Sequence, residues 1–167
     1  MPPLRFARVD SPFGPMWVAE TDAGVAAVSR SDSLESFLAP LRRRFPDREP
    51  VPADLDAFWA EGSSLPAVDL RGLSAFDRAV YEVVRGVSPG ETITYGEVAA
   101  LIGSPGAARA VGGAMSRCPL FPAVPCHRVV RASDGWSGWG GDVTLKRRLL
   151  EAERRPASPA AKTFEFP

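Results

Sequence analysis

The side chains best suited to covalent chemistry lie in Pro125-Cys126-His127-Arg128-Val129-Val130, where a cysteine precedes the only histidine of the chain. A thiolate rather than a thiol attacks electrophiles, and a neighbouring imidazole and guanidinium would favour the ionised form. Adjacent side chains of an extended segment point to opposite faces, so a direct Cys126–His127 ion pair would need a turn or a bridging water. The segment therefore contains a candidate nucleophile but disfavours a cysteine protease, and an inert buried cysteine is the alternative.

A zinc site is a second possible interpretation of these residues. Cys118, Cys126 and His127 are the only soft ligands in the chain. Zinc would need a fourth ligand, and the Cys-x7-Cys-His spacing matches no familiar structural site. We therefore expect neither a metal ion nor another cofactor.

Three further residues could serve either function or structure. Arg109 is a long cation midway along a predicted helix of mostly small residues, so it could enter a nucleic-acid duplex or simply lie in solvent. Tyr95 begins a predicted helix and could donate from its phenol or lie half-buried. Glu153 lies near the end of the last predicted helix, where a surface acid is the ordinary interpretation.

The N-terminal part of the sequence has the pattern of a β-meander followed by a helix. Strands are predicted near 4–10, 15–21 and 25–29, around the turn signals Ser11-Pro12-Phe13-Gly14 and Asp22-Ala23-Gly24. The helix is predicted from apolar residues at helical spacing, with Asp32 as N-cap and Pro46 as its stop. Prolines and acidic residues over 46–69 indicate a linker with a short helix near 53–60, and the domain boundary is predicted near residue 68.

The second module is predicted to be mainly helical. A helix begins at Ser74, a capping box at Thr94-Tyr95-Gly96-Glu97 opens another, and Gly103 closes it. Ser104 as N-cap and Pro105 as first residue predict the next helix over about 105–117, which completes a helix-turn-helix pattern. Prolines exclude helix over 118–126, glycines indicate a loop over 135–141, and a last helix is predicted over 143–154 with Leu145, Leu149 and Leu150 inside.

Composition and charge limit the class of protein. The 167 residues are 45% hydrophobic and 24% charged, which argues against wholesale disorder. No uncharged apolar stretch approaches the roughly 18 residues of a membrane span, and the start of the chain lacks signal-peptide features, so we expect a cytoplasmic protein. The net charge of zero conceals −3 over 1–68 and +3 over 69–155, which makes the second module the better candidate for an anionic partner.

These features together resemble the methylated-DNA–protein-cysteine methyltransferases, DNA repair proteins that remove alkyl groups from the O6 position of guanine. Four motifs carry the resemblance in the family's order and spacing: Tyr95-Gly96-Glu97-Val98-Ala99, Ala107-Ala108-Arg109-Ala110-Val111-Gly112, Pro125-Cys126-His127-Arg128-Val129 and Leu149-Leu150-Glu151-Ala152-Glu153. The resemblance is strong over about 75–155 and looser over the N-terminal meander. It implies an α+β fold with three parts: a small N-terminal domain and linker over 1–68, a DNA-binding alkyltransferase domain with an acceptor loop over 69–155, and a tail over 156–167.

The resemblance also implies the reaction. Cys126 would attack the alkyl carbon in line and keep the alkyl group as a thioether, so each molecule would act once. His127 would take the thiol proton through a water, and Glu153 would hold the imidazole. Tyr95 would donate to the base as guanine leaves. Backbone at Val129 and in the loop at Trp139-Gly140 would recognise the base.

A minor-groove complex with double-stranded DNA is implied as well. The second helix of the pair would lie in the minor groove while the damaged nucleotide is flipped out of the stack. Arg109 would fill the vacated space, and Tyr95 would crowd the flanking phosphate. The positions that would contact DNA are Tyr95, Gly96, Ser104, Arg109 and Ala132.

Three positions depart from the family's pattern. Cys118 stands where the family usually has an Asn that braces the acceptor loop. Trp139 replaces a Tyr, and Gly140 follows it where Arg or Ser is usual. These changes bear on the rigidity of the loop and on the range of substrates, and they leave Cys126 in its place.

The favoured interpretation is a single-turnover alkyltransferase that acts on O6-alkylguanine in DNA as a monomer, without a membrane partner. A non-catalytic alkyltransferase-like damage sensor is the alternative, although relatives of that kind lack the cysteine. A helix-turn-helix regulator of the major groove is disfavoured, because the second helix has almost no side chains able to read base edges.

Overall fold

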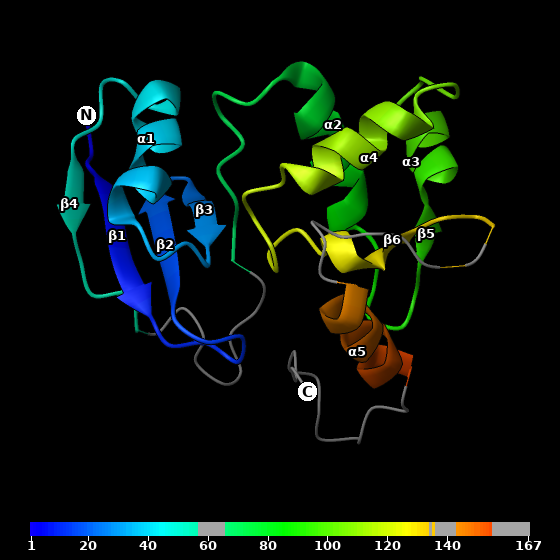
Figure 1. Ribbon diagram of the computed structural model, residues 1–167. Helices are drawn as coiled ribbons and strands as arrows, with labels where there is room; N and C mark the ends of the chain where they lie inside the picture. Colours follow the sequence, from blue (N-terminus) through cyan, green and yellow to red (C-terminus); the bar gives the residue numbers. More distant parts are fainter. Residues whose placement is uncertain (57–65, 134, 136–142, 155–167) are drawn as a thin grey trace. The chain divides into compact units, whose positions relative to one another are not determined.

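A computed structural model of the chain describes residues 1–56, 66–133, 135 and 143–154. The chain divides into two compact units, Met1–Leu73 and Ser74–Pro167. Figure 1 shows strands β1 to β4 in the first unit and most of the helices in the second. Among the described residues, no helix is both long and apolar enough to cross a membrane.

The sheet of the first unit is the predicted meander with one additional strand. Strands β1 (Leu4–Val9), β2 (Met16–Thr21) and β3 (Gly24–Ser29) are antiparallel neighbours. Strand β4 (Pro50–Pro52) pairs in parallel with β1, so the strand order is β3-β2-β1-β4. The predicted linker therefore contains a strand. Its prolines are accommodated because β4 lies at the edge of the sheet, where a missing N–H is tolerated.

Helix α1 (Leu34–Arg44) supplies the other half of this unit's core. Its N-cap is Ser33, whose hydroxyl accepts from the amide of Ser36 at 3.2 Å, and not Asp32 as predicted. Asp32 lies one residue too early for that bond and pairs with Arg8 instead, at 3.4 Å. The buried core joins the sheet to the helix through Leu4, Phe6, Ala19, Ala26, Ala27, Phe37, Leu38, Leu41 and Phe45.

Helix α2 (Ala75–Arg85) is the buried helix of the second unit and begins at the predicted cap, Ser74. The hydroxyl of Ser74 accepts from the amide of Asp77 at 3.0 Å. The phenol of Tyr81, which is fully buried, donates to the carbonyl of Ala114 at 2.9 Å and so fixes α2 to a later helix.

The helix pair of the second unit consists of α3 (Tyr95–Leu101) and α4 (Ala108–Ser116), which pack against each other (Figure 1). The predicted capping box of Thr94 and Glu97 opens α3, and Gly103 turns the chain with φ of +78°. Helix α4 begins three residues later than predicted and Ser104 is not its N-cap. The carbonyl of Ser104 accepts from the amide of Ala107 in a separate turn, and α4 has no side-chain cap.

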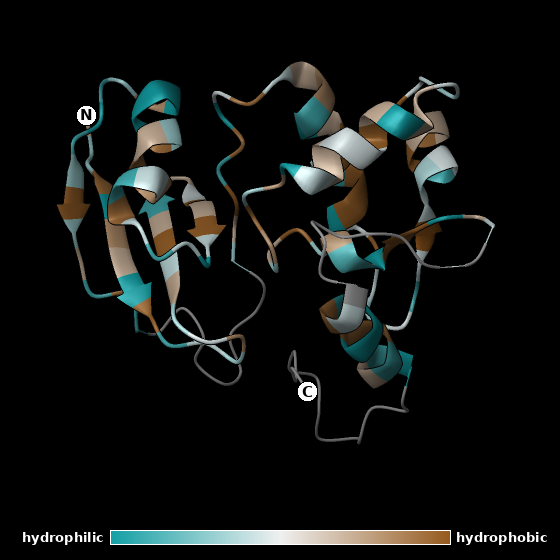
Figure 2. Ribbon diagram, in the orientation of Figure 1, coloured by the Kyte–Doolittle hydropathy of each residue, from teal (hydrophilic) through white to brown (hydrophobic). Residues whose placement is uncertain are grey.

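Two short parallel strands connect the helix pair to the cysteine segment. Strand β5 (Ile93–Thr94) pairs with β6 (Val129–Val130), with Thr94 opposite Val130. The last helix, α5 (Val143–Arg154), occupies the predicted range. In Figure 2, hydrophobic and hydrophilic colours alternate around α5, as expected for a helix with one buried face.

Candidate active site

Cys126 lies at the start of a single 3-10 turn, Cys126–Arg128, that follows three closely spaced prolines. Its side chain is only 1% exposed, and Sγ donates to the carbonyl of Val124 at 3.3 Å. The amide of Val129 donates to the carbonyl of Cys126 and closes the turn. The sequence argument assumed an extended strand, in which the side chains of Cys126 and His127 would point to opposite faces. The segment is a turn instead, so that argument does not apply to it.

The surroundings of Cys126 hold its side chain as a neutral thiol. A side-chain interaction with Cys118 and complete burial raise the pKa of Cys126 well above its ordinary value. The backbone of Cys126 and the charge of Lys146 lower the pKa of the thiol, but they do not outweigh these two effects. The adjacent guanidinium, which the sequence suggested as an activating group, is bound elsewhere.

His127 is fully buried, and its Nε2 lies 2.7 Å from Oε1 of Glu153. Burial lowers the pKa of His127, while the hydrogen bond to Glu153 acts in the opposite direction. An ionised carboxylate can only accept, so Nε2 must carry the hydrogen of a neutral ring. The other nitrogen, Nδ1, is then the one that can take a proton, and it is also buried.

Glu153 receives hydrogen bonds from two residues of the turn. Arg128 donates to it through Nε at 3.0 Å and through Nη2 at 2.8 Å, and also donates through Nη1 to the carbonyl of Val87 at 2.7 Å. Burial would raise the pKa of Glu153, but the bonds from His127 and Arg128 lower it to about 2. Glu153 is therefore a partly buried carboxylate that is ionised at neutral pH, with its side chain 10% exposed, and the surface acid of the ordinary interpretation is wrong.

The inner face of α5 also carries a lysine that the sequence did not single out. Lys146 is fully buried, whereas Leu145, predicted to lie inside, is only partly buried. Nζ of Lys146 donates to the carbonyl of Val129 at 2.5 Å. The spacing could have indicated this position, because Lys146, Leu149, Leu150 and Glu153 recur at i, i+3, i+4 and i+7 on one helical face.

The residues expected at DNA lie on α3, in the turn between α3 and α4, on α4 and after β6. The pairing of Thr94 with Val130 brings Tyr95, the first residue of α3, beside the acceptor segment. Tyr95 is half-buried, and its ring lies next to Gly112 of α4, where a Cβ atom would be 3.9 Å from two ring carbons. Arg109 is exposed on α4.

The remaining predicted positions are less closely defined. Gly96 and Ala132 are exposed and Ser104 is half-buried. Val129 is buried in β6. Trp139 and Gly140 lie outside the described residues, so the loop expected to recognise the base is not part of this site as described.

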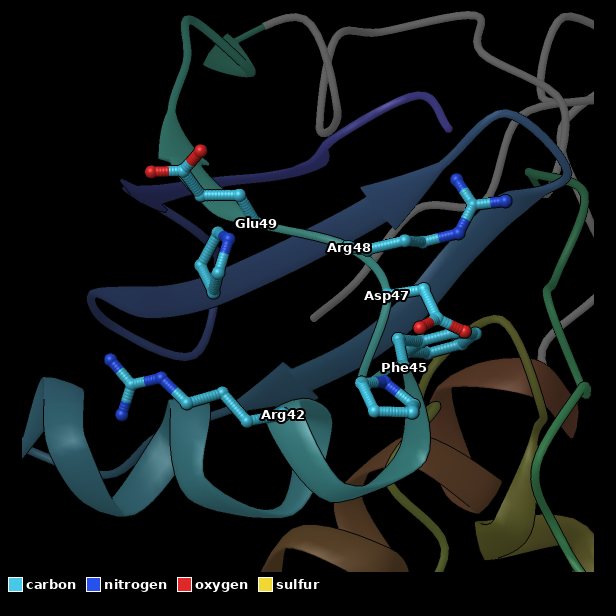
Figure 3. A pocket seen from close by; sticks show the side chains of 7 residues that line it. Arg42, Phe45, Asp47, Arg48 and Glu49 are labelled. Carbon is cyan, nitrogen blue, oxygen red and sulfur yellow. The ribbon is translucent and has the colours of Figure 1, made fainter.

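A separate pocket of about 420 Å³ lies in the first unit, between the end of α1 and the segment that leads into β4 (Figure 3). Its walls are charged and include no cysteine or histidine: Arg42, Phe45, Pro46, Asp47, Arg48, Glu49 and Pro50. Within the described part of the chain, no group of three His, Cys, Asp or Glu side chains could hold a metal ion. The candidate nucleophile Cys126 and its neighbours His127 and Glu153 all lie in the second unit.

Comparisons with known proteins agree with this assembly of residues. Residues 75–155 match the family model described as 6-O-methylguanine DNA methyltransferase, DNA binding domain. A methylated-DNA–protein-cysteine methyltransferase of Mycobacterium tuberculosis is 37% identical over 169 residues, covering 97% of this chain and 99% of the relative.

Solved structures extend the similarity to the fold. The crystal structure of M. tuberculosis O6-methylguanine methyltransferase has a TM-score of 0.68 and 34% identity, covering 95% of this chain and 96% of its own. That of the M. tuberculosis OGT in complex with DNA has a TM-score of 0.66 and 32% identity, covering 90% and 93%. With relatives this similar over nearly the whole length of both chains, the protein belongs to the methylated-DNA–protein-cysteine methyltransferase family.

Proposed function

We propose that this protein repairs O6-alkylguanine in double-stranded DNA by transferring the alkyl group irreversibly to Cys126. The observation that carries the proposal is the buried turn at Cys126–Arg128, in which the cysteine stands beside a histidine held by a partly buried carboxylate. An unactivated alkyl ether demands a soft nucleophile, and a cysteine thiolate is the softest that a protein offers.

The transfer exchanges one bond for another. The proton of Cys126 passes through a water to Nδ1 of His127, whose ring stays oriented because Nε2 donates to Glu153. Sγ then bonds to the alkyl carbon as the bond from that carbon to O6 breaks, and the hydroxyl of Tyr95 donates a hydrogen bond to the base as guanine leaves. The thiol proton ends on the released guanine, and the product is a thioether. No step regenerates the thiol, so each molecule acts once.

Nucleotide flipping would bring the alkyl group to this buried thiol. In the proposed complex α4 lies in the minor groove, where its small side chains permit a close approach. Arg109 fills the space left in the stack, and Tyr95 crowds the flanking phosphate. Gly96, Ser104 and Ala132 contact the DNA backbone, while backbone at Val129 and the loop at Trp139-Gly140 recognise the base.

The same proposal assigns roles to the parts of the chain. Residues 69–155 form the DNA-binding alkyltransferase domain, with a charge of +3 toward a polyanion. Residues 1–68 are a structural partner and 156–167 a tail. The protein acts in the cytoplasm, as a monomer and without a cofactor.

Intact-mass measurement tests the proposal against a damage sensor. After mixing with a duplex that contains O6-methylguanine, the protein should gain the mass of one methyl group, and the duplex should contain guanine in its place. A mixture with unmodified duplex is the control. Tight binding to the methylated duplex with no gain in mass would favour the sensor and contradict the transferase.

A further inference from the structure

Cys118 is a second thiol beside the acceptor, and the proposed transfer makes no use of it. The segment 118–126 has a cysteine at each end, and these are the only cysteines of the chain. The side chains of Cys118 and Cys126 are hydrogen-bonded to each other. Both also lie close enough to the buried phenol of Tyr81 to interact with it electrostatically. The acceptor is therefore in contact with a thiol that has no part in the transfer.

The main chain between the two cysteines forms a series of hydrogen-bonded turns. The amide of Cys118 donates to the carbonyl of Met115, near the end of α4, at 3.3 Å. The amide of Val124 donates to the carbonyl of Leu120 at 2.9 Å, and the amide of Cys126 donates to the carbonyl of Val124 at 2.8 Å. The contact between the thiols is therefore set by the folded backbone and does not depend on a chance meeting of mobile side chains.

The two thiols differ in their exposure to solvent. Cys126 is 1% exposed, and its Sγ donates to the carbonyl of Val124. Cys118 follows the end of α4 and is partly exposed. Oxidants attack the thiolate, and the raised pKa of Cys126 keeps the acceptor protonated. A small oxidant in solution should therefore react with Cys118 before it reacts with Cys126.

We propose that Cys118 and Cys126 form a reversible disulfide when the protein meets a hydroperoxide, and that this bond stops alkyl transfer until a thiol reductant breaks it. Cys118 is the residue that the oxidant attacks first, and it accepts no alkyl group. The disulfide depends only on the two cysteines, whereas its consequence for repair rests on the proposed function.

The oxidation takes place in two balanced steps. Sγ of Cys118 takes one oxygen from hydrogen peroxide as the O–O bond breaks, which gives a sulfenic acid and one water. Sγ of Cys126 then attacks the sulfur of the sulfenic acid, so the S–S bond forms, the S–O bond breaks, and the hydroxyl leaves as water with the proton of Cys126. A dithiol such as dithiothreitol returns both thiols in a two-electron exchange and is itself oxidised to its disulfide.

The second step needs only a local movement. A disulfide brings the two sulfur atoms to about 2.05 Å, which is nearer than a hydrogen bond between thiols. Sγ of Cys126 must therefore leave the carbonyl of Val124, while Cys118 lies outside any helix or strand and can move without breaking one. In the disulfide, Cys126 has neither a free thiol nor a proton to give to His127, so transfer stops.

Mass spectrometry of a single tryptic peptide detects the bond, because the peptide over 118–128 contains both cysteines. The protein is treated with hydrogen peroxide, and the remaining thiols are blocked with N-ethylmaleimide in denaturant. We expect this peptide to lose the mass of two hydrogen atoms and to gain no maleimide, while the protein stays monomeric. Two thiols that still react with maleimide, disulfide-linked dimers, or oxygen added to Cys126 alone would each overturn the proposal.

Two variants test the order of the steps. Cys126→Ser should stop at the sulfenic acid of Cys118, which dimedone traps as a stable adduct. Cys118→Ser should keep its Cys126 thiol through the same treatment, since the buried thiol reacts slowly. Thermal unfolding before treatment shows that each variant folds, and Cys118→Asn takes the place of Cys118→Ser if the serine variant does not. Absence of a dimedone adduct in folded Cys126→Ser would overturn the assignment of Cys118 as the first site of oxidation.

A matched control moves the second thiol along the chain. Ser116→Cys in the Cys118→Ser background returns a cysteine to an exposed position on α4, two residues before the natural one. This variant should form no internal disulfide under the same treatment. A disulfide formed as readily as in wild type would mean that the contact seen between Cys118 and Cys126 does not direct the reaction.

The consequence for repair is measured by single-turnover transfer from an O6-methylguanine duplex. The fraction of wild-type protein that accepts a methyl group should fall about tenfold once about nine-tenths of the peptide is oxidised, and dithiothreitol should restore it. Treated Cys118→Ser should match its own untreated sample. Equal losses in both proteins would mean that Cys126 is oxidised directly and would overturn the proposal. If untreated wild type transfers no methyl group, the proposed function fails, while the mass of the 118–128 peptide still decides the disulfide.

Discussion

Cys126 is held as a neutral thiol in the resting protein, and a neighbouring group must take its proton before it can react. Cys118 and burial raise the pKa of its thiol, and Sγ donates to the carbonyl of Val124. A neutral, buried thiol reacts slowly with alkylating agents and oxidants, because only the thiolate reacts quickly. In the proposed reaction the thiolate therefore forms as substrate arrives, with His127 as the proton acceptor.

Cys118 is expected to be a structural stand-in for the family's bracing Asn and not a second nucleophile. A thiol is a weak donor and acceptor, whereas an amide does both well. Cys118→Asn should leave the single-turnover rate on methylated duplex intact or raise it a few-fold, because the group that raises the pKa of Cys126 is removed. The number of alkyl groups accepted should stay at one. A variant that unfolds at the wild-type temperature but transfers much more slowly would show a chemical role for Cys118.

Glu153→Gln is expected to impair both transfer and stability. The amide would orient His127 less firmly. It would also leave the buried guanidinium of Arg128 without an opposite charge, which should lower the free energy of unfolding by about 3 kcal/mol at neutral pH. Transfer to free O6-benzylguanine should slow about 100-fold, the size of a general-base contribution. Single-turnover kinetics and denaturant unfolding measure the two effects.

The stability difference should depend on pH in a defined direction. The pKa of Glu153 is lowered from 4.5 to about 2 in the folded protein, so its charge stabilises the fold above about pH 4.5. Wild type should thus lose its advantage over Glu153→Gln as the pH falls from 4.5 toward 2. An advantage that stays constant over this window would mean that the carboxylate charge does not hold the site together.

The site residues that could be predicted from sequence are those in compact motifs. Cys126, His127 and Glu153 stand in such motifs, and the structure brings them together. Lys146 was missed because a lysine in an amphipathic helix is ordinarily solvent-exposed, and only the carbonyl of Val129 makes its burial possible. The contact between Cys118 and Cys126 was missed because it depends on how the intervening prolines fold the chain.

At the scale of elements, α4 is the one that the proposed function places in the minor groove, and Arg109 is its exposed cation. Arg109→Ala should slow repair of duplex DNA by about 10- to 100-fold and leave reaction with free O6-benzylguanine nearly unchanged. The reason is that free base needs no unstacking, which costs a few kcal/mol in a duplex.

Arg78→Ala is the control for Arg109, because Arg78 is an exposed arginine on α2 of the same unit. It removes the same charge and should change neither rate. Single-turnover rates of both variants on both substrates make the comparison. Equal losses on duplex and free base in Arg109→Ala would mean that Arg109 supports the fold or the pocket.

Elements with several turns or an alternating pattern were predictable, and the shortest ones were not. Strands β1 to β3 and helices α1 to α5 were all expected near their observed positions. Strands β5 and β6 have two residues each, too few for a period, and β4 is rich in proline. The late start of α4 was missed because Ser104-Pro105 has the composition of a helix start but forms a turn.

Across the whole molecule, the described chemistry is confined to one unit. The second unit contains Cys126, His127, Glu153 and the helix pair, and the region 69–155 carries +3. The first unit has its own core and a charged pocket without a nucleophile. The family relationship extends over both units, because the M. tuberculosis relative aligns with 97% of the chain.

The identity of the alkyl acceptor is the central claim, and peptide mapping after single-turnover reaction tests it most directly. The protein is incubated with excess O6-methylguanine duplex, digested and analysed by mass spectrometry, with Cys126→Ser as the matched variant. We expect one methyl group per protein, entirely on the peptide that contains Cys126, and no turnover beyond one. Cys126→Ser should gain no mass while still binding the duplex, because phosphate contacts do not need the thiol. Methylation at Cys118, or more than one turnover per protein, would contradict the account.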